Sequence, residues 1–178
     1  MRITAGMHRG RVVNVPDLPG LRPTPSRVRE ALFNILGEVE GFAILDLFAG
    51  SGIMAIEALS RGAGSALSIE QSGRACGAMK GCREQIGLEN WTIRKGKLPA
   101  ALEQCAATHF DLIFADPPYD RGIAEQIPAW LENSAIDCDL LVIEESAKAA
   151  PHWPEGWTVH QSRRYGDTDL HFLERARP

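Results

Sequence analysis

The sequence predicts an α/β fold in which a mostly parallel, seven-stranded, Rossmann-like sheet is covered by helices on both faces. Short apolar runs alternate with segments of helical periodicity from residue 42 to residue 146, and this alternation is typical of a parallel sheet between two helical layers. Residues 156–175 hold two further strand-like runs joined by YGDT with no helix between them, which predicts an antiparallel hairpin at the sheet's edge. Residues 1–40 follow a different pattern and predict a small extension.

The extension is expected to be a β-hairpin followed by a helix. RITAG and RVVNV are β-prone runs separated by MHRG, so they predict the hairpin. After a proline-rich segment, Ser26 is a good N-cap and Gly37 ends the periodic run, so a helix is expected between them. One face of that helix carries Val28, Ala31, Leu32 and Ile35.

The main domain is expected to occupy residues 41–178. Its parallel strands are predicted at residues 42–48, 65–70, 91–96, 110–116 and 140–146. Helices are predicted between them at residues 51–62, 72–87, 99–107 and 122–133.

The composition, 44% hydrophobic and 24% charged, is that of an ordinary globular domain. No run reaches the roughly 18 apolar residues of a membrane span, and residues 1–10 lack the apolar core of a signal peptide, so we expect a cytoplasmic protein. The cysteines form no CxxC pair and have no His at zinc-ligand spacing, so we expect reduced thiols and no metal site. They are Cys76, Cys82, Cys105 and Cys138.

Charge is unevenly distributed along the chain. Residues 1–29 hold six arginines and one acid, Asp17, whereas the whole chain has a formal net charge of -4. A basic arm on an acidic body indicates contact with nucleic acid, although a solvated surface would explain the charge equally well. The arginines are Arg2, Arg9, Arg11, Arg22, Arg27 and Arg29.

A glycine-rich turn follows the first predicted strand of the main domain, at LDLFAGSG. Ligands of doubly wound sheets bind beyond the carboxyl ends of the strands, where glycines such as Gly50 and Gly52 allow close approach to the backbone. Gly50, Gly52 and Ala55 also match a dinucleotide fingerprint, with Glu70 about 20 residues further on. The turn alone therefore leaves the ligand open.

Asp46 favours a cationic ligand at this turn. It precedes Gly50 by four residues, where the pyrophosphate of a dinucleotide would meet a negative charge at close range. S-adenosylmethionine carries a sulfonium and an ammonium and no phosphate, so it suits Asp46. Glu70 can accept hydrogen bonds from two ribose hydroxyls with either ligand.

The strand FDLIFAD ends in Asp116, Pro117, Pro118 and Tyr119, on the same predicted edge as the glycine turn. The prolines restrict the backbone, so the Asp116 carboxylate and the Pro117 carbonyl are held in place. Both can accept N–H bonds from an exocyclic amine of a nucleobase and direct its lone pair toward a methyl donor. The Tyr119 ring offers a stacking face for the base, which would offset part of the free energy of extruding it.

These motifs resemble the Rossmann-like amino-methyltransferases, in which [DN]PP[YF] follows DxFxGxG. The remainder of the chain narrows the resemblance to the RsmD family of bacterial 16S rRNA guanine-N2 methyltransferases, and it runs from Arg2 to about Glu174. The segments that carry it are RITAGMHRGRVVNVPDLPGLRPTPSRVREALFNIL, LDLFAGSGIMAIEALSRGA, FADPPY and YGDTDLHFLER.

The resemblance implies a class I methyltransferase fold, S-adenosylmethionine as methyl donor, and the N2 amine of one guanine in 16S rRNA as acceptor, within the assembling or assembled small ribosomal subunit. The cofactor pocket would be lined by Asp46, Phe48, Gly50, Ser51, Gly52 and Glu70, and the base would be held by Asp116, Pro117, Pro118 and Tyr119. Contacts with RNA, or with the edge of the cofactor, would come from Arg9, Arg11, Arg22, Thr24, Arg27 and Arg29. The alternative for the last four is that they pack the appended helix against the sheet. The sequence gives no reason to prefer a dimer, so we expect a monomer.

The chain departs from the family after the third strand of the main domain. The family usually has a small acidic or amide residue there, which can accept a hydrogen bond from the adenine amine, whereas this chain has Lys97. A Lys side chain donates and cannot accept. We therefore expect either the backbone of Lys97 and Leu98 or another residue to recognise the adenine.

Three alternative functions remain at this stage. One is methylation of adenine N6 in DNA or RNA, or of a protein glutamine, by the same chemistry. Another is a dinucleotide-dependent oxidoreductase that uses Gly50 and Gly52, which Asp46 disfavours. The last is a ribosome-assembly factor that binds RNA without catalysis.

Overall fold

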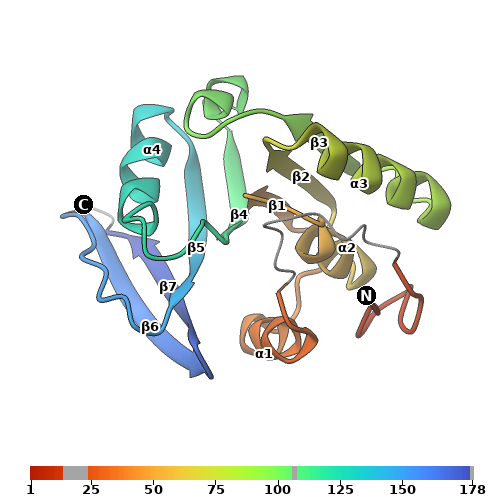
Figure 1. Cartoon of the computed structure of the whole chain (residues 1–178), viewed down its shortest axis with the longest axis horizontal. Coiled ribbons are helices and arrows are strands. Elements are labelled where there is room, and N and C mark those ends of the chain that lie inside the picture. The colour runs from red at the N-terminus through yellow and green to blue at the C-terminus, as the bar shows by residue number, and fades with distance from the viewer. Residues whose placement is uncertain (14–23, 106–107, 177–178) are drawn as a thin grey trace.

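The computed structural model describes residues 1–13, 24–105 and 108–176. Its strands form one seven-stranded sheet in the order β3-β2-β1-β4-β5-β7-β6 (Figure 1). The strands are β1 (Ala43–Leu47), β2 (Ser65–Glu70), β3 (Trp91–Lys95), β4 (His109–Ala115), β5 (Asp137–Ser146), β6 (Trp157–Tyr165) and β7 (Thr168–Arg175). The helices are α1 (Ser26–Leu36), α2 (Ile53–Ser60), α3 (Gly73–Ile86) and α4 (Ile127–Asn133), with 3₁₀ helices η1 (Ala100–Cys105) and η2 (Ala124–Gln126).

The pairing of the strands confirms the predicted fold. Strands β1 to β5 are parallel to one another, β7 is antiparallel to β5, and β6 is antiparallel to β7. The hairpin therefore joins the sheet through its second strand, and β6 forms the edge. Because β1, β2, β4 and β5 run in one direction, their carboxyl ends lie along the same edge of the sheet.

Two hydrophobic cores lie on opposite faces of the sheet, because successive strand residues point to opposite faces. One core packs α1, α2 and α3 against Ile44 of β1 and Phe114 of β4. The other packs η1 and α4 against Leu45 and Ile113, which are the neighbours of those residues in the same strands. Helices thus cover both faces, as predicted.

Several element boundaries differ from the prediction. Helix α1 begins at Ser26, but its N-cap is Pro25 and no side chain caps it, so the capping role expected of Ser26 is wrong. The helix expected at residues 99–107 is the 3₁₀ helix η1 in its described part. The helix expected at residues 122–133 is divided into η2 and α4, and Pro128 lies in the first turn of α4, where its missing N–H leaves no hydrogen bond unmade.

The extension packs on the same core as α2. The predicted hairpin is present as a single antiparallel bridge between Arg2 and Val12 rather than as two strands. Ile3 and Val13 beside that bridge are buried in the core that contains α1 and α2. The division of the chain at residue 40 stays a prediction. No helix in the described residues is long and apolar enough to cross a membrane.

A buried carboxylate on α2 fastens the extension to the main domain. Glu57 accepts hydrogen bonds from the backbone N–H groups of Thr4 (3.0 Å) and Ala5 (3.1 Å), and forms ion pairs with Arg29 (3.2 Å) and Arg61 (3.0 Å). Burial alone would raise the pKa of Glu57, but the hydrogen bonds from Thr4 and Arg61 and the charge of Arg29 outweigh it and lower the pKa. Glu57 is therefore a charged anchor inside the protein.

Candidate active site

Four carboxylates lie at or near the carboxyl ends of neighbouring strands. Asp46 lies in β1, Glu70 is the last residue of β2, Asp116 follows β4, and Glu144 lies in β5. The register pairs Asp46 with Phe114 and Ala115 with Ile143. Asp116 and Glu144, each one residue beyond the latter pair, are therefore neighbours at the point where β4 ends beside β5.

The glycine turn after β1 is held by Glu70 from the next strand. One carboxylate oxygen of Glu70 accepts a hydrogen bond from Gly50 N at 2.9 Å, and the other accepts one from Ser72 N at 2.7 Å. Gly50 and Gly52 have φ angles of 53° and 72°, and a Cβ at Gly52 would lie 2.5 Å from an atom of the Trp91 ring. The turn therefore requires glycine at residue 52 for both its backbone conformation and its packing.

A pocket of about 190 Å³ lies beside this turn. It brings together five of the residues predicted for the site, namely Phe48, Glu70, Lys97, Leu98 and Pro118. Its remaining lining residues are Ile69, Gln71, Gly96, Arg121, Ile123 and Trp130. The pocket thus joins the glycine turn to the DPPY segment.

Six lining residues of this pocket were not predicted from the sequence, and three of them, Arg121, Ile123 and Trp130, come from the DPPY side of the pocket. Arg121 and Ile123 follow the DPPY segment directly, so their distance along the chain could have indicated them. Trp130 comes from α4, and its ring centroid lies 6.4 Å from that of Phe48. In the sequence Trp130 is one more apolar residue of a helix, so nothing there distinguishes it from a core residue.

Asp46 is a buried carboxylate whose described hydrogen-bond partner is a hydroxyl. It is 2% exposed, and Ser68 Oγ donates to its Oδ2 over 3.4 Å. Burial, with a smaller contribution from the charge of Glu70, raises the pKa of Asp46 to about 7. A cation placed beside Asp46 would lower this pKa, so the site favours a positively charged ligand.

The DPPY segment begins as a continuation of the sheet. Asp116 N donates to Leu47 O over 3.4 Å, so the segment leaves β4 directly beside the end of β1. Burial raises the pKa of Asp116 well above its usual value, and the charges of Glu144, Asp46 and Glu145 raise it further. Pro117 is buried and Pro118 is exposed, so the segment turns outward after Asp116.

The Tyr119 side chain is half-buried and its hydroxyl is held on two sides. The hydroxyl donates to Glu144 Oε1 over 2.7 Å and lies 3.2 Å from Thr168 Oγ1. Burial raises the pKa of Tyr119 above its usual value, so the hydroxyl stays protonated at neutral pH. Only part of the Tyr119 side chain remains accessible at the surface.

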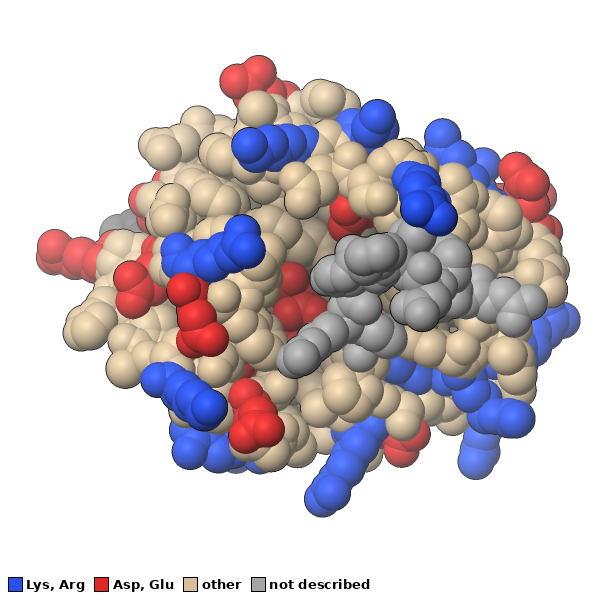
Figure 2. Space-filling view, viewed as in Figure 1, with Lys and Arg blue, Asp and Glu red and all other residues tan. Residues whose placement is uncertain are grey.

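The residues predicted to contact RNA fall into two groups. Arg9, Arg11 and Arg27 are exposed, and Arg22 lies outside the described residues. Figure 2 shows acidic side chains recessed near the middle of one face, with Lys and Arg side chains interspersed with Asp and Glu around its periphery. Exposed arginines remain available to a polyanion.

Arg29 and Thr24 require a correction. Arg29 is 1% exposed, and its guanidinium donates to Glu57 Oε2 (3.2 Å), Thr24 O (3.3 Å) and Arg2 O (2.8 Å). Thr24 is also buried, with its hydroxyl 3.4 Å from Glu144 Oε2. The prediction that these two side chains contact RNA is therefore wrong for this structure, because neither reaches the surface.

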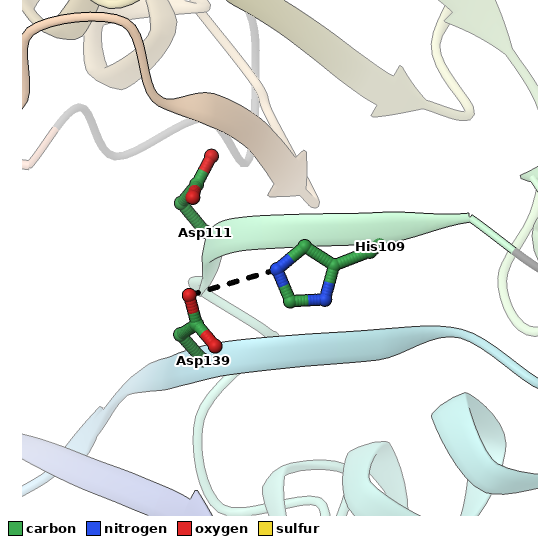
Figure 3. A group of neighbouring side chains, drawn as sticks. All are labelled: His109, Asp111 and Asp139. Carbon is green, nitrogen blue, oxygen red and sulfur yellow. Dashed lines mark ion pairs between the residues drawn. The ribbon is translucent and has the colours of Figure 1, made fainter.

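A separate group of ionisable side chains lies at the opposite, amino-terminal ends of β4 and β5 (Figure 3). It consists of His109, Asp111 and Asp139, the one group of this kind in residues 1–13, 24–105 and 108–176. His109 Nε2 lies 3.6 Å from Asp139 Oδ2, and Asp111 Oδ2 accepts a hydrogen bond from Ala43 N at 2.6 Å. We treat the group as a surface ion pair, and we assign it no ligand.

The chain is similar to known proteins over most of its length. A family model described as "Conserved hypothetical protein 95" matches residues 1–174. The chain is 36% identical over 179 residues to the ribosomal RNA small subunit methyltransferase D of Escherichia coli K12, covering 98% of this chain and 90% of that protein. It is 34% identical to the protein of the same name from Haemophilus influenzae, covering 93% and 89%. The solved structure of yhhF from Escherichia coli superposes with a TM-score of 0.88 at 34% identity, covering 98% and 97%.

Proposed function

The chain belongs to the family described as Conserved hypothetical protein 95, as the resemblance to the RsmD family indicated, and we propose that it methylates 16S rRNA. The proposed donor is S-adenosylmethionine, and the proposed acceptor is the exocyclic N2 amine of one guanine. The relatives named as small subunit rRNA methyltransferases support the reaction class. The choice of guanine N2 rests on the chemistry of the DPPY segment and on the resemblance.

One observation carries the proposal. Asp46 is a buried carboxylate and Asp116 a partly buried one, both with raised pKa values, and they lie at the adjacent ends of β1 and β4. Two residues beyond each of them along the chain, Phe48 and Pro118 line the same pocket. Perturbed carboxylates beside a pocket are typical of catalytic and binding sites. A cationic methyl donor bound at Asp46 and an amine bound at Asp116 would give each of the two carboxylates a function.

The residues beside the glycine turn fit the proposed donor. When bound, S-adenosylmethionine supplies an electrophilic methyl group on a positively charged sulfur. Asp46 would balance the positive charge, and the glycine turn would admit the ligand close to the backbone. Each oxygen of Glu70 accepts one backbone N–H and retains a lone pair for a ribose hydroxyl.

The same pocket provides an apolar slot for the adenine. Phe48, Leu98 and Trp130 line it, and Lys97 stands at its border. We propose that the backbone of Lys97 and Leu98 recognises the adenine edge, because the Lys97 side chain cannot accept a hydrogen bond from the adenine amine.

The DPPY segment would hold and activate the target base. The Asp116 carboxylate and the Pro117 carbonyl would each accept one N–H of the amine, which directs its lone pair to the methyl group. Tyr119 would stack on the base with its ring, while its hydroxyl stays bound to Glu144. Asp116 would then accept the proton that the amine loses as the new N–C bond forms.

The exposed arginines of the extension would bind the rRNA backbone. The candidates that lie within the described residues are Arg9, Arg11 and Arg27. Their guanidinium groups can neutralise phosphates around the target guanine. The substrate would be rRNA within the assembling or assembled small subunit.

The experiment that tests the function uses the purified protein and labelled S-adenosylmethionine. Naked 16S rRNA and small subunits from cells lacking the activity are incubated separately, and the nucleosides are analysed by mass spectrometry. N2-methylguanosine in either reaction supports the proposal, and Asp116→Ala should abolish it while leaving S-adenosylmethionine binding within about twofold. N6-methyladenosine, or label in protein only, would assign the acceptor to one of the alternative classes.

A further inference from the structure

We propose that Glu144 is a positioning residue for the target base. Its carboxylate holds the hydroxyl of Tyr119, whose ring would stack on the base, and it connects Tyr119 to the extension through Thr24. The proposal rests on the function proposed above. Glu144 does not belong to the DPPY motif or to the glycine turn, and it was not among the residues predicted for the site.

Glu144 lies in β5, beside the start of the DPPY segment. Its neighbour Ile143 pairs with Ala115, the residue before Asp116. Glu144 itself is 2% exposed, and on its other side it pairs with Leu170 of β7. A buried carboxylate at the centre of a sheet costs stability unless it is hydrogen-bonded, so its contacts indicate why the position is acidic.

The shortest described contact of Glu144 is with the reactive segment. Tyr119 donates its hydroxyl to Glu144 Oε1 over 2.7 Å, and Thr168 Oγ1 lies 3.2 Å from the same hydroxyl. Hydrogen bonds to the hydroxyl on two sides hold the outer end of the Tyr119 side chain in place and so restrict rotation about its Cα–Cβ bond. The ring is therefore fixed before a base arrives, which lowers the entropy lost when the base stacks on it.

The second oxygen of Glu144 faces the extension. Thr24 Oγ1 lies 3.4 Å from Glu144 Oε2, and the Thr24 carbonyl accepts a hydrogen bond from Arg29 over 3.3 Å. Arg29 in turn is paired with Glu57, which also binds the backbone of Thr4. A continuous chain of contacts thus runs from the Tyr119 ring to the proposed RNA-binding extension.

Glu144 also adds to a group of acids around Asp116. The charged groups that act on Asp116 are Glu144, Asp46 and Glu145, and all three are acidic. After burial, the charge of Glu144 is the largest cause of the raised pKa of Asp116. Asp116 must be ionised to accept the proton of the amine, so the methylation rate should rise with pH as Asp116 ionises.

Two substitutions separate the shape of Glu144 from its charge. Glu144→Gln keeps an acceptor for Tyr119 and replaces the other oxygen by an amide that can donate to Thr24, but it removes the charge. We expect Glu144→Gln to keep kcat within about threefold at high pH. In the plot of kcat against pH, the rise on the acid side (the acid limb) should move to lower pH by roughly half a unit or more. The exposed Glu84→Gln on α3 is the matched control and should leave the limb in place.

Glu144→Ala removes both contacts. We expect kcat to fall by on the order of tenfold to a hundredfold, the loss that removal of one charge-assisted hydrogen bond predicts, with the Kd for S-adenosylmethionine unchanged within about twofold. Tyr119→Phe should reduce kcat through the same contact, so the losses in the double variant should not add. A purely structural role for Glu144 would give additive losses and an unmoved acid limb.

The outcomes are separable. No methyl transfer by the unaltered protein would contradict the proposed function itself. An active protein in which Glu144→Ala retains full kcat, or in which the losses with Tyr119→Phe add, or in which Glu144→Gln leaves the acid limb in place, would overturn this inference alone. If Glu144→Ala fails to fold in thermal melts, Glu144→Gln and its double variant with Tyr119→Phe decide the question.

Discussion

Arg29 and Glu57 form a 3.2 Å ion pair with side chains only 1% and 0% exposed. Arg29 comes from α1 and Glu57 from α2, and the pair also binds the backbone of Arg2, Thr4 and Ala5. The extension is thus held to the main domain by charge inside the protein as well as by apolar packing.

Glu57→Ala should lower the free energy of unfolding by about 3 to 5 kcal/mol, because Arg29 would be left charged and buried without a partner. Urea titration followed by circular dichroism measures the loss. The exposed Glu84→Ala should change stability by less than about 0.5 kcal/mol. Replacing both Arg29 and Glu57 by Met should recover much of the loss, and a double variant as unstable as Glu57→Ala would contradict this account.

Binding of S-adenosylmethionine should strengthen as pH rises through about 7, the raised pKa of Asp46, because only the ionised carboxylate attracts the sulfonium and ammonium. Isothermal titration calorimetry between pH 6 and pH 8.5 tests this, with about tenfold weaker binding expected at pH 6 than at the plateau. The Asp46→Asn variant should bind S-adenosylmethionine weakly, and its affinity should not change as the pH passes through 7. A wild-type affinity that stays constant across the range would exclude an electrostatic role for Asp46.

The same carboxyl group should affect the stability of the protein without ligand. Its pKa is 3.8 in the reference state and about 7 when folded, so the folded state retains the proton longer as pH rises. The contribution of Asp46 to stability is therefore present below 3.8 and is lost as pH rises toward 7. Asp46→Asn should make the protein more stable at pH 8, by on the order of 1 to 3 kcal/mol in urea titrations.

Gly52→Ala should destabilise the protein by roughly 2 to 4 kcal/mol and abolish cofactor binding, because φ is 72° and the new Cβ would lie 2.5 Å from the Trp91 ring. Thermal melts and calorimetry report the two effects. Gly77→Ala in α3 is the contrasting control, since no atom lies within 4 Å of its Cβ, and it should stabilise the protein by up to about 1 kcal/mol. Equal effects of the two substitutions would show that the glycine turn is not constrained.

Arg9→Ala and Arg11→Ala should weaken rRNA binding and make it less dependent on salt, because each exposed guanidinium that binds a phosphate displaces about one counterion. Filter binding at several salt concentrations measures both effects, and the slope of log K against log salt should fall by about one per substitution. Lys80→Ala, an exposed cation on α3 outside the extension, is the control. An unchanged slope in the arginine variants would remove the extension from the RNA interface.

Most of the fold and part of the site could be predicted from local patterns. The order of strands and helices could be predicted from apolar periodicity. The glycine turn and the DPPY segment could be recognised as parts of a site because few other structures require these residue types at the end of a strand. The structure indeed gathers Phe48, Glu70, Lys97, Leu98 and Pro118 around one pocket.

The burial of Arg29 could not be predicted from charge alone. A net charge counts all arginines of a segment alike, whereas the partner that buries Arg29 lies 28 residues away in α2. One signal was available, since Glu57 is the single charged residue of the apolar helix IMAIEALS and a buried acid requires a partner. Glu144 was missed for a related reason, because its proximity to Asp116 depends on the pairing of β4 with β5.

The contact between Tyr119 and Thr168 has a consequence for the time at which the site is complete during translation. Tyr119 is synthesised 49 residues before Thr168, the first residue of β7. A nascent chain that has delivered the DPPY segment still lacks this contact, and it also lacks the strand that pairs with Glu144. The Tyr119 hydroxyl can therefore gain its second partner only after the start of β7 has been synthesised.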